Sequence, residues 1–107
     1  MDYFAESLKL HKQHVWKIET GLKMPLNTRD DLSLAYSPWV AQPCIEIQKD
    51  ESKAYDYTLK ANTVAVISDG SAVLWLGNIG GIAGLPVMEW KCALLKEFGW
   101  VNGFPII

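Results

Sequence analysis

The sequence predicts an α/β fold in which N-terminal helices are followed by a β-hairpin, one long helix and a final strand. Three observations predict it: a helical apolar period near the N-terminus, two β-branched runs within residues 63–76, and a second helical period over residues 86–98. The 107 residues are 50% hydrophobic, which suffices for one modest core. No internal repeat or low-complexity segment divides the chain, so we expect a single domain over residues 1–107.

The first half of the chain has the pattern of several short helices. Apolar residues at helical spacing predict a helix over residues 4–15. Thr28 is expected to cap another helix, with Asp31 three residues later as its capping-box partner. Pro38 should end that helix, and the Ser37-Pro38 pair then predicts the start of a third helix that runs toward Lys49. A further short helix is expected over residues 52–59.

The second half predicts the β-structure and the longest helix. Residues 63–68 and 72–76 flank Asp69-Gly70, which is typical of two strands joined by a tight turn. A glycine-dense loop over residues 77–81 leads into a helix in which Pro86 should sit early, where its missing N–H is tolerated. Gly99 is the expected end of that helix, and Phe104 begins the last strand.

Charge and cysteine content exclude several kinds of partner. The net charge is −2, with 10 basic and 12 acidic residues and no basic stripe, so neither nucleic acid nor a membrane surface is expected as a partner. The N-terminus has no secretory leader pattern, and Cys44 and Cys92 lack the spacing of a redox or zinc motif. We therefore expect two reduced cysteines and a cytoplasmic location.

Three groups of residues have both a structural and a chemical interpretation. Lys91 falls in the middle of an apolar arc formed by Val87, Leu94, Leu95 and Phe98, where it either extends its ammonium to water or serves as a base in a partly dry pocket. Tyr36 lies at a helix junction, where a tyrosine is more often a hydrogen-bonded corner than a catalytic phenol. The third group is a histidine pair, His11 and His14, whose spacing suits a metal but which has no third ligand nearby.

Three segments together resemble one known family. TRDDLSLAYSPWVAQPC, AYDYTLKANTVAVISDG and LGNIGGIAGLPVMEWKCALLKEFG look like the N-terminal domain of malic enzymes of the short prokaryotic type, and the resemblance runs from about Leu8 to Pro105. It implies an oxidoreductase that converts malate to pyruvate with NAD or NADP and with Mg or Mn. We expect the present chain to hold neither cofactor nor metal. The partners implied are malate or pyruvate and a second subunit of a homodimer.

The resemblance also implies roles for particular residues. Tyr36 in LAYSP matches the family tyrosine that protonates the enolate left after carbon dioxide departs, and Lys91 in VMEWK matches the lysine that takes the hydroxyl proton during hydride transfer. Gly77, Asn78 and Gly80 match the substrate-side glycine loop, where backbone amides can approach a carboxylate. Restoring glycine at Trp75 would complete a GxGxxG pattern, but the chain is too short for a dinucleotide fold, so no cofactor site is expected.

Two departures from the family pattern bear on activity. All five tryptophans stand where the family usually has glycine: Trp16, Trp39, Trp75, Trp90 and Trp100. The family's acidic metal ligands and its dinucleotide-binding domain would follow the last strand, so we expect a truncated domain that is inactive alone. The alternative is an engineered, non-catalytic scaffold or a self-associating module, since clustered indoles are typical of association surfaces.

Overall fold

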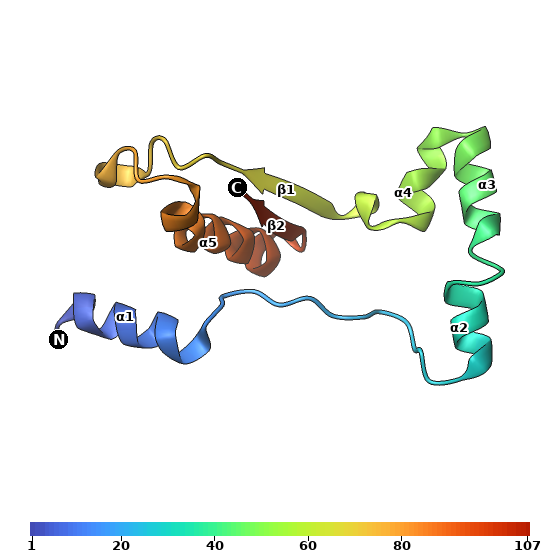
Figure 1. Ribbon diagram of the computed structural model, residues 1–107, viewed down its shortest axis with the longest axis horizontal. Coiled ribbons are helices and arrows are strands. Elements are labelled where there is room, and N and C mark those ends of the chain that lie inside the picture. Colours follow the sequence, from blue (N-terminus) through green and yellow to red (C-terminus); the bar gives the residue numbers. More distant parts are fainter. The chain divides into compact units, whose positions relative to one another are not determined.

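The computed structural model describes residues 1–107 and confirms the α/β class, with α-helices and a two-stranded parallel sheet (Figure 1). The chain forms two compact units. Unit 1 joins Met1–Glu19 to Thr63–Ile107, and unit 2 is Thr20–Asn62. Each unit has its own internal contacts. The expectation of a single domain stays a prediction.

Unit 1 is built around a β-α-β arrangement. Strand β1 (Thr63–Ile67) pairs in parallel with β2 (Asn102–Ile106), in a register that runs from Thr63 opposite Asn102 to Ile67 opposite Ile106. Helix α5 (Gly81–Gly99) connects the strands and packs against them, mostly against β2 (Figure 1). Parallel strands need such a crossover, because the chain must return to the same end of the sheet.

The predicted hairpin is wrong. Residues 72–76 form no strand: Val73 makes one isolated bridge to Gly77, and a 3₁₀ turn covers Leu74–Leu76. The turn at Gly70 exists, but its carbonyl accepts from the amides of Ile79 and Gly80 at 3.0 and 3.2 Å. The β-branched run therefore folds back onto the glycine loop, while β1 takes its partner from beyond α5.

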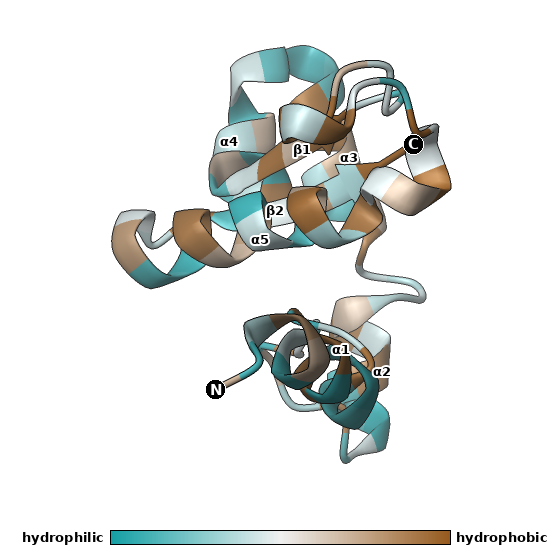
Figure 2. Ribbon diagram, turned by 90° about the vertical axis from the view of Figure 1, so that its left-hand side faces the viewer, coloured by the Kyte–Doolittle hydropathy of each residue, from teal (hydrophilic) through white to brown (hydrophobic).

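The core of unit 1 is small. The buried side chains are Val73, Met88 and Cys92, and Gly84 completes the buried stripe on α5. Figure 2 shows that hydrophobic segments recur along α5, and hydrophobic side chains that do not face the sheet, among them Trp90 and Phe98, are exposed. A helix that is apolar over most of its circumference is typical of a helix with more than one packing partner.

The N-terminal helix agrees with its prediction. Helix α1 (Tyr3–His14) is capped by Asp2, whose carboxylate accepts from the amides of Phe4 and Ala5. None of its residues is buried, and Phe4 and Leu8 are largely exposed. None of the helices in the chain combines the length and apolar character that crossing a membrane requires.

Unit 2 consists of short helical elements. Helix α2 (Arg29–Ala35) has the predicted capping box, in which the Thr28 hydroxyl accepts from the Asp31 amide and the Asp31 carboxylate accepts from the Thr28 amide. The remaining elements are α3 (Ala41–Lys49), a 3₁₀ turn (Glu51–Lys53), α4 (Ala54–Tyr57) and a second 3₁₀ turn (Leu59–Ala61). The helix expected over residues 52–59 is thus broken into shorter turns.

Two predicted helix starts are misplaced. Ser37-Pro38 does not begin α3; this bond is cis and lies in a turn closed by the Val40 amide and the Tyr36 carbonyl at 2.9 Å. Helix α5 begins at Gly81, so Pro86 lies inside the helix rather than in its first turn. The end of α5 is close to the prediction, because Gly99 is its last residue and Trp100 caps it.

Candidate functional site

The residues predicted to act in chemistry lie in both units. Lys91 and the loop of Gly77, Asn78 and Gly80 belong to unit 1, whereas Tyr36 belongs to unit 2. The loop leads directly into α5, and Lys91 lies further along that helix, so the loop and Lys91 belong to one continuous segment of unit 1.

Lys91 is exposed on α5, which agrees with the alternative in which its ammonium extends to water, but the expectation that the apolar arc around Lys91 faces the core is wrong. The buried positions are Gly84, Met88 and Cys92, spaced four residues apart, so the core-facing stripe is rotated around the helix from the predicted arc. Close packing against β2 explains why this stripe of α5 faces the core. Cys92 lies so near to Gly103 on β2 that there is no room for a side chain at position 103. Lys91 thus stands at the edge of the stripe.

The glycine loop has a conformation that favours glycine at two positions. Gly77 and Gly80 have φ values of 71° and 82°, in the left-handed region where a side chain is strained. A Cβ atom on either glycine would meet no atom within 4 Å, so the space beside the loop is open. Asn78 between them is exposed. The loop can therefore admit a ligand close to its backbone.

The loop also ends at the N-terminus of a long helix. Gly80 is the N-cap of α5 and has no side chain that could satisfy the first amides. The Gly84 amide bonds to the Gly80 carbonyl at 3.2 Å, whereas the helical pattern leaves the preceding amides without an intrahelical acceptor. Such amides, together with the helix dipole, favour an anion such as a carboxylate.

Tyr36 is the C-cap of α2, and its side chain is exposed to solvent. Its side chain is 74% exposed, so it is not a buried, hydrogen-bonded corner. Its backbone is fixed on both sides: the amide donates to the Leu32 carbonyl at 3.0 Å, and the carbonyl accepts from Val40. A rigid backbone with an exposed phenol is suited to presenting the hydroxyl to a ligand.

Trp39, three residues after Tyr36, and Trp90, next to Lys91, are both more than half exposed, at 55% and 54%. Neither lies in the buried part of its unit. Among the five tryptophans only Trp100 has a positive φ, at 58°, so the expected backbone strain of an indole in a glycine position falls on Trp100 alone.

Sequence reasoning overlooked Lys17. Its ammonium donates to the Pro86 carbonyl at 2.7 Å, a contact between residues 69 positions apart. Partial burial lowers the pKa of Lys17, and the nearby Glu89 carboxylate opposes this by raising it. The only signal in the sequence was a lysine between two apolar residues, Trp16 and Ile18.

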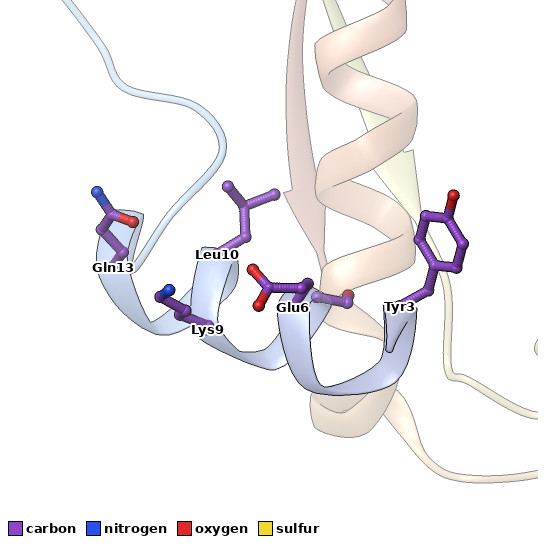
Figure 3. A pocket seen from close by; sticks show the side chains of 6 residues that line it. Tyr3, Glu6, Lys9, Leu10 and Gln13 are labelled. Atoms are coloured by element: carbon purple, nitrogen blue, oxygen red, sulfur yellow. The ribbon is translucent and has the colours of Figure 1, made fainter. Parts of the chain in front are cut away.

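A surface hollow lies on another element, the N-terminal helix. A shallow groove of about 390 Å³ runs along α1 and is lined by Tyr3, Glu6, Ser7, Lys9, Leu10 and Gln13 (Figure 3). All six side chains come from this single helix, and none was predicted to act in chemistry. The groove therefore has no wall from a second element and lacks the enclosure of a small-molecule site.

The side chains that could bind a metal ion do not form a cluster. The chain contains no group of three or more histidine, cysteine, aspartate or glutamate side chains arranged to hold a metal ion. His11 bonds through Nδ1 to the Ser7 carbonyl at 2.8 Å, and His14 is exposed. The cysteines are free, Cys44 exposed and Cys92 buried.

Comparison with known proteins gives a consistent result. A family model described as malic enzyme, N-terminal domain, matches residues 16–107. The NAD-dependent malic enzyme of Geobacillus stearothermophilus is 59% identical over 90 residues, which are 84% of this chain and 19% of that protein. The NADP-dependent malic enzyme of Escherichia coli is 58% identical over 90 residues, which are 84% of this chain and 12% of that protein.

Solved structures agree with the sequence relatives. The crystal structure of malic enzyme from Pyrococcus horikoshii superposes with a TM-score of 0.92 at 52% identity, covering 97% of this chain and 25% of that one. The chain thus spans about a quarter or less of the length of the relatives it matches. These matches give no support to the alternative of an engineered scaffold or self-associating module.

Proposed function

This chain belongs to the malic enzyme family, and on that basis we propose that it is the malate-facing N-terminal part of an NAD- or NADP-dependent malic enzyme. The observation that carries the proposal is the family match over residues 16–107, which includes Tyr36, the glycine loop and Lys91. The activity belongs to the longer enzyme, and the chain alone is inactive.

Two residues carry proton transfers in this proposal. Lys91, as the neutral amine, takes the proton of the malate hydroxyl while the hydrogen on the same carbon leaves as hydride, which yields oxaloacetate. Carbon dioxide then departs, and its bonding electrons remain as an enolate. Tyr36 gives its phenolic proton to the enolate carbon, which yields pyruvate. The exposed positions of both side chains leave them accessible to a substrate.

The glycine loop binds a substrate carboxylate in this proposal. Gly77 and Gly80 allow close approach of the backbone, and the first amides of α5 supply donors without competing side chains. Asn78 adds a side-chain amide at the same place. In this proposal the loop orients malate relative to Lys91, which lies on the helix that follows the loop.

The cofactors belong to other parts of the enzyme. We propose NAD or NADP as the hydride acceptor and Mg²⁺ or Mn²⁺ as the metal. The residues of this chain fit neither group, because no cluster of metal ligands is present and residues 68–80 separate β1 from α5 in place of the tight turn of a dinucleotide site. A cytoplasmic homodimer completes the proposal, in keeping with two free cysteines and several exposed apolar side chains.

A chimeric enzyme tests the proposal. The 90 matched residues of the E. coli NADP-dependent malic enzyme are replaced by those of this chain, and malate-dependent NADP reduction is measured with metal present. Lys91→Met should lower kcat by roughly 100-fold or more, the usual contribution of a general base. Tyr36→Phe should slow the exchange of pyruvate methyl hydrogens with deuterated solvent to a similar extent.

Matched controls make the result specific. Tyr57→Phe and Lys60→Met change an exposed tyrosine and an exposed lysine of unit 2 and should leave both rates unchanged. A Lys91→Met chimera that keeps its full rate would overturn the assignment of the base. Malate-dependent reduction of cofactor by the 107-residue chain alone would contradict the expectation that it is inactive.

A further inference from the structure

Helix α5 has a weak point at Pro86. The proline lies in the interior of the helix and has no N–H, so the carbonyl of Ile82 receives no helical hydrogen bond from it. Gly81 and Gly84 lower the helical propensity of the same end. The helix is therefore weakest between its first turns, which continue the glycine loop, and the half that carries Lys91.

Lys17 contacts the helix at this weak point. Its Nζ lies 2.7 Å from the Pro86 carbonyl oxygen, a short distance typical of a charged donor. A carbonyl oxygen has two lone pairs, so it can accept from Lys17 as well as from the Trp90 amide that the helical pattern assigns to it. The contact joins segment Met1–Glu19 to α5 within unit 1.

The Lys17 contact spans a much longer stretch of sequence than the other side-chain hydrogen bonds of lysines in the chain. Lys49 and Lys53 pair with acids three residues away, and such exposed local pairs contribute little. Lys96 donates to a side chain six residues away. Lys17 instead reaches a backbone carbonyl on a distant element, and it is partly buried. The carboxylate of Glu89, one turn from Pro86, raises the pKa of Lys17 and so favours its charged form.

We propose that Lys17 is a positioning residue that braces α5 at Pro86 and so holds the glycine loop, residues 77–80, in a fixed orientation to Lys91. The significance of that orientation rests on the proposed function. The contact between Lys17 and Pro86 lies within this chain, so the brace itself can be tested without measuring enzyme activity. It predicts that loss of the ammonium disturbs the Pro86 carbonyl and loosens the helix around it, while the buried core of Val73, Met88 and Cys92 stays intact.

Carbonyl NMR of the 107-residue chain tests the brace. Residues 86–87 are the only Pro-Val pair in the sequence, so labelling proline with ¹³C at the carbonyl and valine with ¹⁵N gives a single Pro86–Val87 correlation. Lys17→Met should move the Pro86 carbonyl resonance to lower frequency, because it loses a charged donor. Lys17→Arg should restore most of the shift, and Lys12→Met on exposed α1 should leave it unchanged. An unmoved resonance in Lys17→Met overturns the proposal.

Hydrogen exchange provides the second measurement. The Trp90 amide should exchange about tenfold faster in Lys17→Met, a change that corresponds to about 1.4 kcal/mol. In a Pro86→Ala background the helix regains the missing bond, so the same substitution should have a smaller effect. An equal effect in both backgrounds would show a general contribution to helix stability and would contradict a brace at the proline.

If Lys17→Met does not fold, a measurement on the unmodified chain tests the proposed brace. The ammonium protons of Lys17 should exchange with water more slowly than those of exposed Lys12, and equal rates overturn the proposal. These outcomes are independent of the Lys91→Met assay. The brace can therefore fail while Lys91 remains the base, and it can hold in a chain whose Lys91 has no catalytic role.

Discussion

Gly103 lies directly against Cys92: a Cβ atom on Gly103 would come within 3.0 Å of the Cα, Cβ and Sγ atoms of Cys92. Helix α5 and strand β2 are therefore in close contact at this point, and Cys92 is the most buried side chain of the chain at 1% exposure. The pair fixes which side of α5 faces the sheet. It thereby sets Lys91, one residue earlier, at the edge of the buried stripe.

We expect Gly103→Ala to destabilise the chain by about 1–3 kcal/mol, because the added methyl group overpacks the contact with Cys92. Gly99→Ala is the matched control: its Cβ would meet no atom within 4 Å, and alanine favours the helix by roughly 0.5–1 kcal/mol over glycine. Urea unfolding curves give both values. Equal free energies of unfolding for the two variants would show that α5 and β2 are not in close contact.

The two cysteines should differ strongly in reactivity. Burial is the main cause that raises the pKa of the Cys92 thiol, which lowers its thiolate fraction, whereas Cys44 is exposed. At pH 8 a disulfide reagent should modify Cys44 within seconds to minutes and Cys92 only as fast as unit 1 opens. Mass spectrometry of peptides from timed samples measures each rate. Equal rates in the folded chain would contradict the burial of Cys92.

Trp100 should be the one tryptophan whose replacement by glycine stabilises the chain. It holds the left-handed conformation that ends α5, with φ 58° and ψ 23°, and its side chain is 83% exposed. Glycine adopts this conformation without the cost of about 1 kcal/mol that an L side chain incurs, so Trp100→Gly should raise the free energy of unfolding by about 1 kcal/mol.

The control for this prediction is Trp75→Gly. Trp75 is also 83% exposed, but its φ is not positive, so glycine relieves no strain there and should be neutral or destabilising. Thermal unfolding followed by circular dichroism compares the two variants. A larger gain from Trp75→Gly than from Trp100→Gly would show that strain at the helix end is not the cause.

Local signals predicted part of this fold, and long-range packing decided the rest. The capping box of Thr28 and Asp31 was readable because every group in it lies within four residues. The partner of β1 was not readable, because a β-branched run after Asp69-Gly70 has the pattern of a hairpin whichever strand lies beside it. Only the packing of α5 brings β2 to β1.

The candidate site shows the same division. The residues Tyr36, Gly77, Gly80 and Lys91 came from family resemblance, and their roles stay predictions. Periodicity placed Lys91 at the centre of the core-facing stripe because Val87, Leu94 and Phe98 are apolar, but the small residues Gly84 and Cys92 pack more closely. Lys17 was overlooked because its acceptor is a backbone carbonyl 69 residues away, and no sequence pattern indicates such a contact.

The capping box of α2 should make that helix sensitive to acid. Asp31 accepts hydrogen bonds from the amides of Asn27 and Thr28, and these bonds lower its pKa. A carboxyl whose pKa is lower in the folded state stabilises the fold fully above its ordinary pKa, about 4. That contribution is then lost as the pH falls through the lowered value. We therefore expect α2 to fray below about pH 4.

Carbon chemical shifts of residues 29–35, measured from pH 6 to pH 2, follow this loss of helix. Asp31→Asn should weaken α2 at pH 6 and flatten its pH dependence, whereas Asp30→Asn leaves both partners of the capping box in place and should retain the acid transition. Thr28→Ala removes the N-cap hydroxyl and should cost about 1 kcal/mol at every pH in this range. If the acid transition of α2 persists unchanged in Asp31→Asn, the titration of another group causes that transition.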